Sequence, residues 1–176
     1  ISLNKITIII GLISIILVVT YPFMKRITHW PQLFLGITFN WGVIMGWTSV
    51  SESLSPVIFL IYLSSIFWTL GYDTVYGYQD IVDDKIIGIK STAVLFEKNP
   101  KTAIYTFYII SFLLMFMAMI WIGSSYKTFL VFLCAVMLGI VLLGKLNLRE
   151  VQSCASFFLA NKYIGFLVVL ALALSI

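Results

Sequence analysis

Four of the seven acidic residues of this chain fall in residues 72–96, directly after a membrane-length apolar run. A single helix through the segment, at about 100° per residue, would place these acids within roughly ±80° of Asp73. The face carries four carboxylates, a phenol and a glycine: Asp73, Tyr76, Gly77, Asp80, Asp83 and Asp84. Because like charges at i,i+4 repel, Asp80 and Asp84 together predict a bound cation.

The chemistry that this pattern indicates is Mg²⁺ binding. Magnesium prefers oxygen ligands and typically binds through one or two carboxylates, with waters and substrate phosphates completing its shell. A diphosphate bridged to the metal is therefore the expected ligand. The expected metal ligands are Asp73, Asp80, Asp83 and Asp84. The alternative is a solvated interfacial loop whose charges merely balance.

Basic residues follow the acids within one loop, as a diphosphate site requires. They are Lys85, Lys90, Lys98 and Lys101. Gly88 and Ser91 flank the Lys90 segment, so backbone and hydroxyl donors can approach phosphate oxygens there. Lys90 and Ser91 are therefore expected to bind the diphosphate, and Tyr76 on the acidic face is a further candidate for substrate binding.

A second candidate group lies at the end of the first apolar run. Tyr21 and Lys25, spaced i,i+4, could reach one phosphate or carboxylate together, and Arg26 could bind a planar carboxylate through two hydrogen bonds. The function indicated is anion capture. The alternative is that the tyrosine and the neighbouring tryptophan are ordinary anchors at the membrane interface.

The elements that position these residues are membrane-spanning helices. Of 176 residues, 61% are hydrophobic and 10% are charged, and these proportions exclude an ordinary soluble domain. Six apolar runs approach the length that a spanning helix needs. They are residues 6–21, 33–50, 57–72, 103–123, 129–143 and 157–174. We therefore predict an all-α, polytopic transmembrane bundle that forms a single domain over residues 1–176.

The basic residues are distributed unevenly between the two sides of this predicted bundle. One side holds nine of the eleven, if Lys162 reaches it by snorkelling: Lys25, Arg26, Lys85, Lys90, Lys98, Lys101, Lys145, Arg149 and Lys162. By the positive-inside rule, this side and the acidic site face the cytoplasm, or the matrix of a mitochondrion. We expect an integral protein of a bacterial inner membrane, or of the mitochondrial inner membrane. The net charge of +4 follows from this topology, and no nucleic-acid-binding motif is present.

Polar and small residues within the apolar runs predict contacts between helices. Gly42 and Gly46 form a GxxxG pair that favours close helix packing. Asn40 and Asn161 must find hydrogen-bond partners inside the bundle. For these two residues the alternative is direct contact with a ligand.

The acidic segment resembles a known family. Its pattern DxxYxxxDxxDD followed by GxKS resembles the second aspartate-rich motif of the UbiA superfamily of intramembrane prenyltransferases. The segments YPFMKR, WPQ and FNWGVIMGW, and later FFLANKYIG, resemble the branch that acts on 4-hydroxybenzoate. The resemblance covers essentially the whole chain.

The resemblance implies a nine-helix bundle, of which this chain would form helices four to nine. The family's first aspartate-rich motif, NDxxDxxxD, is not found, and the chain begins with isoleucine almost at the first span. We therefore expect an amino-terminally incomplete domain, or a separate chain that supplies the first motif. The chain by itself is expected to be inactive.

The activity implied by the resemblance is transfer of a polyprenyl group from polyprenyl diphosphate to 4-hydroxybenzoate, an early membrane step of ubiquinone biosynthesis. Magnesium on Asp80 and Asp84, assisted by Asp83 and Asp73, would act with Lys90 to neutralise the diphosphate. The aromatic ring would then attack the allylic cation. Other acceptors of the superfamily remain open: haem, a naphthoate, a chlorophyll precursor and a glyceryl phosphate. So do an inactive remnant and a membrane protein of transport or assembly.

Overall fold

The computed structural model describes residues 3–51 and 53–175, which contain helices and connecting loops only. The first residue, on which the prediction of an incomplete start rests, lies outside this part. The elements are α1 (Lys5–Thr20), η1 (Tyr21–Phe23), α2 (Met24–Ile27), α3 (Pro31–Phe39), α4 (Trp41–Ser51), α5 (Pro56–Gly77), α6 (Ile81–Ile87), α7 (Thr92–Leu95), α8 (Pro100–Trp121), α9 (Tyr126–Lys145) and α10 (Val151–Ala173).

Six helical segments are long and apolar enough to cross a membrane, as predicted, and the chain is an integral membrane protein. The first segment runs continuously from α1 through η1 and α2, and the second joins α3 to α4. Three spans begin with proline at the first helical position, where the missing N–H removes no helical hydrogen bond. The sixth span begins at Val151 rather than at residue 157, because the polar turn before the apolar run is also helical.

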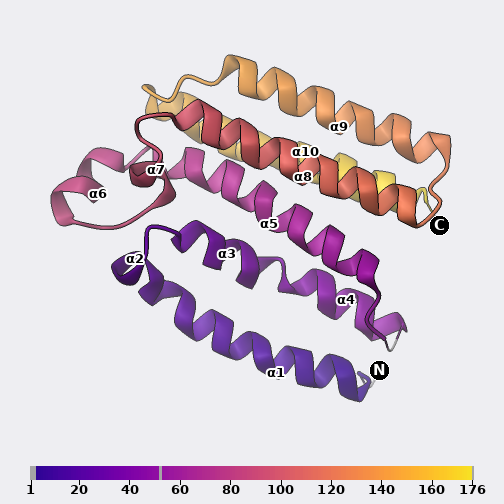
Figure 1. Cartoon of the computed structure of the whole chain (residues 1–176). Coiled ribbons are helices and arrows are strands. Elements are labelled where there is room, and N and C mark those ends of the chain that lie inside the picture. The colour runs from indigo at the N-terminus through magenta and orange to yellow at the C-terminus, as the bar shows by residue number, and fades with distance from the viewer. Residues whose placement is uncertain (1–2, 52, 176) are drawn as a thin grey trace.

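The spans place the short elements and the basic loops at one end of the bundle, called here the polar end. Helices α2, α6 and α7 lie there, and both termini lie at the opposite end (Figure 1). The structure puts eight basic residues at the polar end: Lys25, Arg26, Lys85, Lys90, Lys98, Lys101, Lys145 and Arg149. The prediction for Lys162 is wrong, because the early start of α10 leaves this residue at mid-helix.

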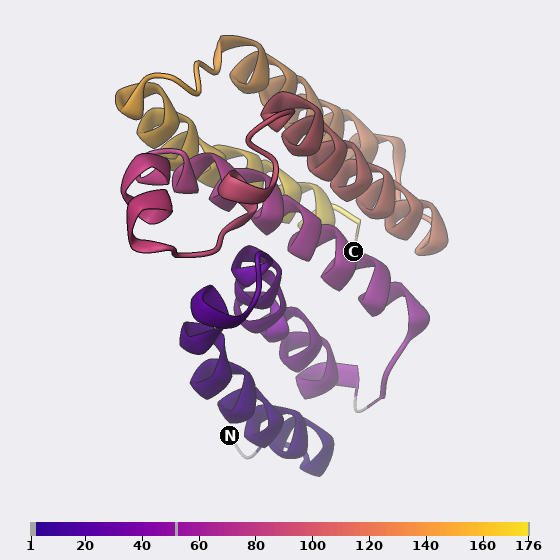
Figure 2. The same ribbon diagram turned by 60° about the vertical axis from the view of Figure 1, so that its left-hand side comes forward.

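Helix α5 connects the two halves of the molecule. It lies between the α1–α4 half and the α8–α10 half (Figure 2). On one side, Leu70 packs in a core with Ile10 and Ile44, and on the other, Val75 packs with Tyr108 and Ile164. Both sides of α5 pack against apolar cores. Its charged residue, Asp73, therefore lies in the last turns, near the polar end.

The predicted close contact at Gly42 and Gly46 is wrong within the part of the chain that the structure describes. Apart from the neighbouring residues and the backbone of α4 itself, no described atom lies within 4 Å of a Cβ built at either position. The buried face of α4 carries Ile44 and Thr48, and the glycines, two residues removed, lie on the opposite face. The close contact forms instead at Gly71, where a Cβ would lie 2.6 Å from the ring of Tyr108.

Replacing Gly71 by alanine is expected to lower the free energy of unfolding by about 1–3 kcal/mol, because the added methyl overpacks a fully buried ring. The ring has little room to move, since its hydroxyl is hydrogen-bonded to Asn161. Denaturation of the purified protein in mixed micelles measures the change. Gly46→Ala is the matched control and should be neutral or slightly stabilising; an equal loss in both variants would contradict the packing argument.

Candidate functional site

A polar cavity of about 140 Å³ opens at the polar end of the bundle. Eight of the ten predicted site residues line it: Tyr21, Lys25, Asp73, Tyr76, Asp80, Asp84, Lys90 and Ser91. Pro31, Gln32, Gly77 and Ile89 complete the lining. Two groups that are about 50 to 70 residues apart in the sequence therefore meet at one cavity. Arg26 and Asp83 do not line it.

The acids do not lie on one helix, so the helical face drawn from the sequence is wrong. Helix α5 ends at Gly77, and α6 begins only after Asp80. The N–H groups of Tyr78 and Gln79 donate to carbonyls three residues earlier, a tight turn that ends α5. Asp80 precedes the first turn of α6 as its N-cap residue, a position that aspartate favours. Asp73 thus reaches the cavity from α5, whereas Asp80 reaches it from the N-cap of α6 and Asp84 from within α6.

The turn spacing of α6 decides which acids face the cavity. The N–H of Asp84 donates to the carbonyl of Asp80 at 2.8 Å, so these residues lie one above the other. Asp83 is exposed and lies outside the cavity lining. Burial raises the pKa of the Asp84 carboxyl above its ordinary value, and Lys25 opposes this effect. The negative charges of Asp80 and Asp83 add to the rise.

Two lysines reach the cavity from loops that are bound to each other. The backbone N–H of Lys90 donates to the carbonyl of Lys25 at 3.1 Å, and the Lys90 Nζ donates to the carbonyl of Ile27 at 3.2 Å. This leaves the Lys90 ammonium with further donors for an anion. Lys85, in contrast, pairs with Glu97 at 2.8 Å on the surface. Of the four lysines predicted to follow the acids, only Lys90 lines the cavity.

The hydroxyl residues of the cavity differ in their surroundings. Ser91 is buried and caps α7, because its Oγ accepts a hydrogen bond from the N–H of Val94. Its own O–H can still donate to an anion in the cavity. Tyr76 is 45% exposed and its ring packs against Phe158. Tyr21 begins η1 and faces the acids from the other half of the bundle.

Gln32 is a cavity residue that the sequence reasoning missed. It is buried near the start of α3, and its Oε1 accepts a hydrogen bond from the N–H of Thr92 at 3.0 Å. The hydroxyls of Thr74 and Thr92 are also hydrogen-bonded, at 2.7 Å. The amide therefore fixes the start of α7 to α3 beside the cavity. The signal available in the sequence was a polar residue directly after Pro31, on a largely apolar helix.

The two asparagines form hydrogen bonds in the bundle interior, as predicted, and neither lines the polar cavity. Asn40 donates to the Oγ1 of Thr69 at 2.9 Å. The Oδ1 of Asn161 accepts from the Tyr108 hydroxyl at 2.5 Å and from the Trp68 Nε1 at 3.0 Å. Both side chains connect helices within the bundle.

The fit of the cavity to a metal ion follows from its donors. Among the residues that the structure describes, no group of three or more acidic, histidine or cysteine side chains could hold an ion. The predicted four-carboxylate ligand set is therefore not assembled. Magnesium, however, is commonly held by one or two carboxylates together with waters and phosphate, and Asp80 and Asp84 fit that mode.

The sequence of this chain is similar to those of known proteins. The sequence model of the UbiA prenyltransferase family matches residues 1–173. A relative named 4-hydroxybenzoate polyprenyltransferase, mitochondrial, from Rattus norvegicus is 41% identical over 98% of this chain and 46% of its own length. A 4-hydroxybenzoate octaprenyltransferase from Serratia proteamaculans is 38% identical over 99% of this chain and 60% of its own length.

A solved structure shares the fold. The apo structure of a UbiA homolog from Aeropyrum pernix K1 has a TM-score of 0.79 and 19% sequence identity, over 97% of this chain and 64% of the homolog. The chain spans about half the length of the mammalian relatives that it matches. The comparisons therefore agree with the all-helical bundle predicted from the sequence.

Proposed function

Because the chain belongs to the UbiA prenyltransferase family, we propose that it forms part of an enzyme that transfers a polyprenyl group from polyprenyl diphosphate to the ring of 4-hydroxybenzoate. The observation that carries the proposal is the convergence of three carboxylates and two lysines on one cavity at the polar end. The names of relatives about 40% identical support the acceptor. The reaction would be an early membrane step of ubiquinone biosynthesis.

We assign the metal to the acids of the cavity. Asp80 and Asp84 would hold Mg²⁺, and Asp73 would assist from α5. When bound, the ion would neutralise the diphosphate and make it a better leaving group. Asp83 keeps only an indirect role in this proposal, because it lies outside the cavity and adds negative charge near Asp84.

The basic and hydroxyl residues would bind the diphosphate directly. Lys25 and Lys90 would donate to its oxygens, and Ser91 would donate its hydroxyl hydrogen. The bond between the allylic carbon and the diphosphate oxygen breaks, and its electron pair leaves with the diphosphate. The aromatic ring then attacks ortho to its hydroxyl, and loss of the ring proton restores aromaticity. The lysines thus stabilise the charge that appears on the leaving group.

The acceptor would bind between the donor and the loops of the polar end. Tyr76 lines the acidic side of the cavity, and Tyr21 lines the opposite side. Arg26 is exposed on α2, next to Lys25, and does not line the cavity. We propose that it binds the acceptor carboxylate through two hydrogen bonds at the mouth, or closes over the diphosphate.

The described residues supply too few clustered acids for a complete metal site of the family type. We propose that a second acidic motif, NDxxDxxxD, reaches this cavity from another segment or from a separate chain. The polar end, with its eight basic residues, would face the cytoplasm or the mitochondrial matrix. The host membrane would be a bacterial inner membrane or the mitochondrial inner membrane.

Transfer of labelled 4-hydroxybenzoate to a polyprenyl chain tests the proposal. The assay uses liposomes that contain this chain alone, or this chain joined to the segment of the Serratia proteamaculans relative that it does not match. We expect magnesium-dependent product from the joined chain and none from the chain alone. A naphthoate, haem and a glyceryl phosphate are offered in parallel; preference for one of them would change the acceptor, and no transfer to any acceptor would overturn the function.

A further inference from the structure

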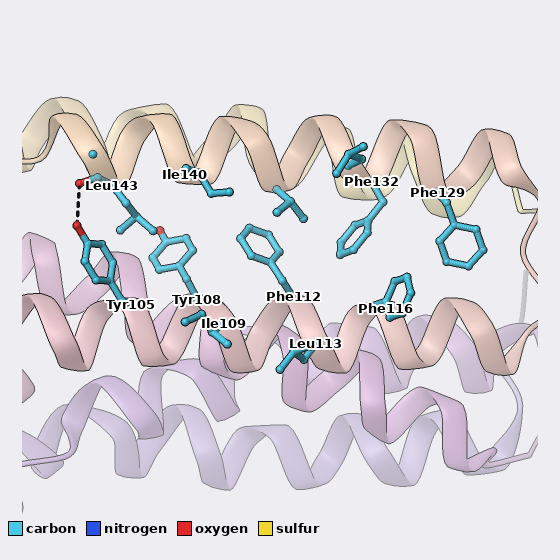
Figure 3. Close-up of a pocket in the computed structure, with 13 residues that line it drawn as sticks. Tyr105, Tyr108, Ile109, Phe112, Leu113, Phe116, Phe129, Phe132, Ile140 and Leu143 are labelled. Atoms are coloured by element: carbon cyan, nitrogen blue, oxygen red, sulfur yellow. Dashed lines mark hydrogen bonds between the residues drawn. The ribbon is translucent and has the colours of Figure 1, made fainter.

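A second and larger cavity lies between α8 and α9, on the outer side of the bundle. Its volume is about 760 Å³, within the roughly 300–1,000 Å³ of ordinary ligand pockets. Aromatic and aliphatic side chains from both helices point toward one another across it (Figure 3). No lining residue is shared with the polar cavity. We call this cavity the α8–α9 groove.

The groove has a buried floor and an exposed rim. Helix α8 packs mainly against α5 and α9 mainly against α10, so the two helices separate along their length. Tyr108 and Phe132 form part of the floor and are 1% and 5% exposed. Ile109 and Leu113 of the rim are 58% and 56% exposed. The rim faces outward from membrane-spanning helices, so a hydrocarbon chain could enter sideways from the bilayer.

Two contacts mark the ends of the groove. At the polar end, the Tyr105 hydroxyl donates to the carbonyl of Leu143 at 3.5 Å (Figure 3). At the other end, the rings of Phe116 and Phe129 pack edge to face, with their centroids 5.5 Å apart. Tyr105 and Phe116 are eleven positions apart on α8, which corresponds to about 17 Å at 1.5 Å per residue. One leaflet of hydrocarbon is about 15 Å thick, so the groove matches one acyl chain.

The polar end of the groove is positively charged. Lys101 precedes Tyr105 by one helical turn, and Lys145 follows Gly144 of the groove lining. Both lysine side chains are exposed. The nearby acid Glu150 already accepts a hydrogen bond from the Asn147 Nδ2 at 2.7 Å. Two cations at the level of lipid headgroups favour an anionic phosphate there.

We propose that the α8–α9 groove binds one acyl chain of an anionic phospholipid, whose phosphate lies between Lys101 and Lys145. The length of the groove suits the chain, and the two lysines suit the headgroup. The diphosphate of the polyprenyl donor is assigned elsewhere, to a cavity with its own carboxylates and lysines. The inference is therefore independent of the prenyl-transfer proposal.

Native mass spectrometry of the full chain tests this site with added phosphatidylglycerol and phosphatidylcholine of the same acyl chains. Ile109→Trp fills the groove from its exposed rim, and Leu113→Trp is a second such variant. Ile120→Trp is the matched control, because Ile120 is 57% exposed on the same helix but does not line the groove. Circular dichroism melting selects the variants that fold.

We expect the unchanged chain and Ile120→Trp to retain phosphatidylglycerol, and both groove-filling variants to lose it. Lys101→Ala with Lys145→Ala should reduce retention of phosphatidylglycerol relative to phosphatidylcholine by about tenfold, whereas Lys127→Ala at the opposite end should not. Equal retention of both lipids by all variants would overturn the proposal in favour of general lipid association. Preferential retention of farnesyl diphosphate, or a dimer that Ile109→Trp abolishes, would overturn it in favour of another occupant.

Discussion

Asp84→Asn is expected to lower prenyl transfer by at least about 100-fold in the chain joined to its complementary segment, because it removes one of the two carboxylates that would hold the Mg²⁺ ion, and the ion would neutralise the diphosphate. The substitution keeps the size of the side chain and removes its charge. Asp84 lines the polar cavity one helical turn from Asp80, so both carboxylates are placed to bind one ion. Initial rates at saturating magnesium, with donor and acceptor in excess, measure the loss.

Asp83→Asn is the matched control for this variant. Asp83 lies next to Asp84 on α6 but is exposed and outside the cavity lining. It should therefore lower the rate far less, although the sequence pattern assigned both residues to the metal. Asp80→Ala should behave like Asp84→Asn. Equal losses at Asp83 and Asp84, with folding intact, would show that the metal is held in a different geometry.

Asn161→Leu is expected to destabilise the bundle by about 1–3 kcal/mol for each of the two buried donors that it leaves unpaired. The donors are the Tyr108 hydroxyl and the Trp68 Nε1, which share the Oδ1 of Asn161. Both lie among the packed helices α5, α8 and α10. Denaturation in mixed micelles measures the free energy of unfolding.

A double-mutant cycle separates these hydrogen bonds from simple packing. In a Tyr108→Phe background one of the two donors is already gone, so Asn161→Leu should be less destabilising there. An equal effect of Asn161→Leu in both backgrounds would contradict the hydrogen-bond argument. The prenyl-transfer rate should fall only as far as folded protein is lost, because Asn161 does not line the polar cavity.

The sequence predicted the spans because membrane solvation imposes a strong pattern over about 20 residues. It also predicted the two charged groups of the site, but not their meeting. That meeting depends on the hydrogen bond from the Lys90 N–H to the Lys25 carbonyl, which joins residues 65 positions apart. No local pattern encodes such a contact. Gln32 was missed for the same reason, since its partner Thr92 is 60 positions away.

Two local predictions were wrong because the tertiary context differs from the idealised helix. A continuous helix was drawn through the acids, whereas the chain turns between Gly77 and Ile81. The GxxxG spacing predicted contact at Gly42 and Gly46, whereas the tight packing uses Gly71. Spacing alone shows which residues share a face. It does not show which face is covered, nor where a helix stops.

The position of Lys162 has a consequence for how the protein is made. This lysine lies eleven residues from each end of α10, and a charge at the centre of a membrane helix makes its insertion less favourable by about 2.5–3.5 kcal/mol. Helix α10 packs against α5 and α9, which are synthesised before it. Insertion of α10 should therefore depend on helices that are already in the membrane, so that assembly proceeds in the order of synthesis.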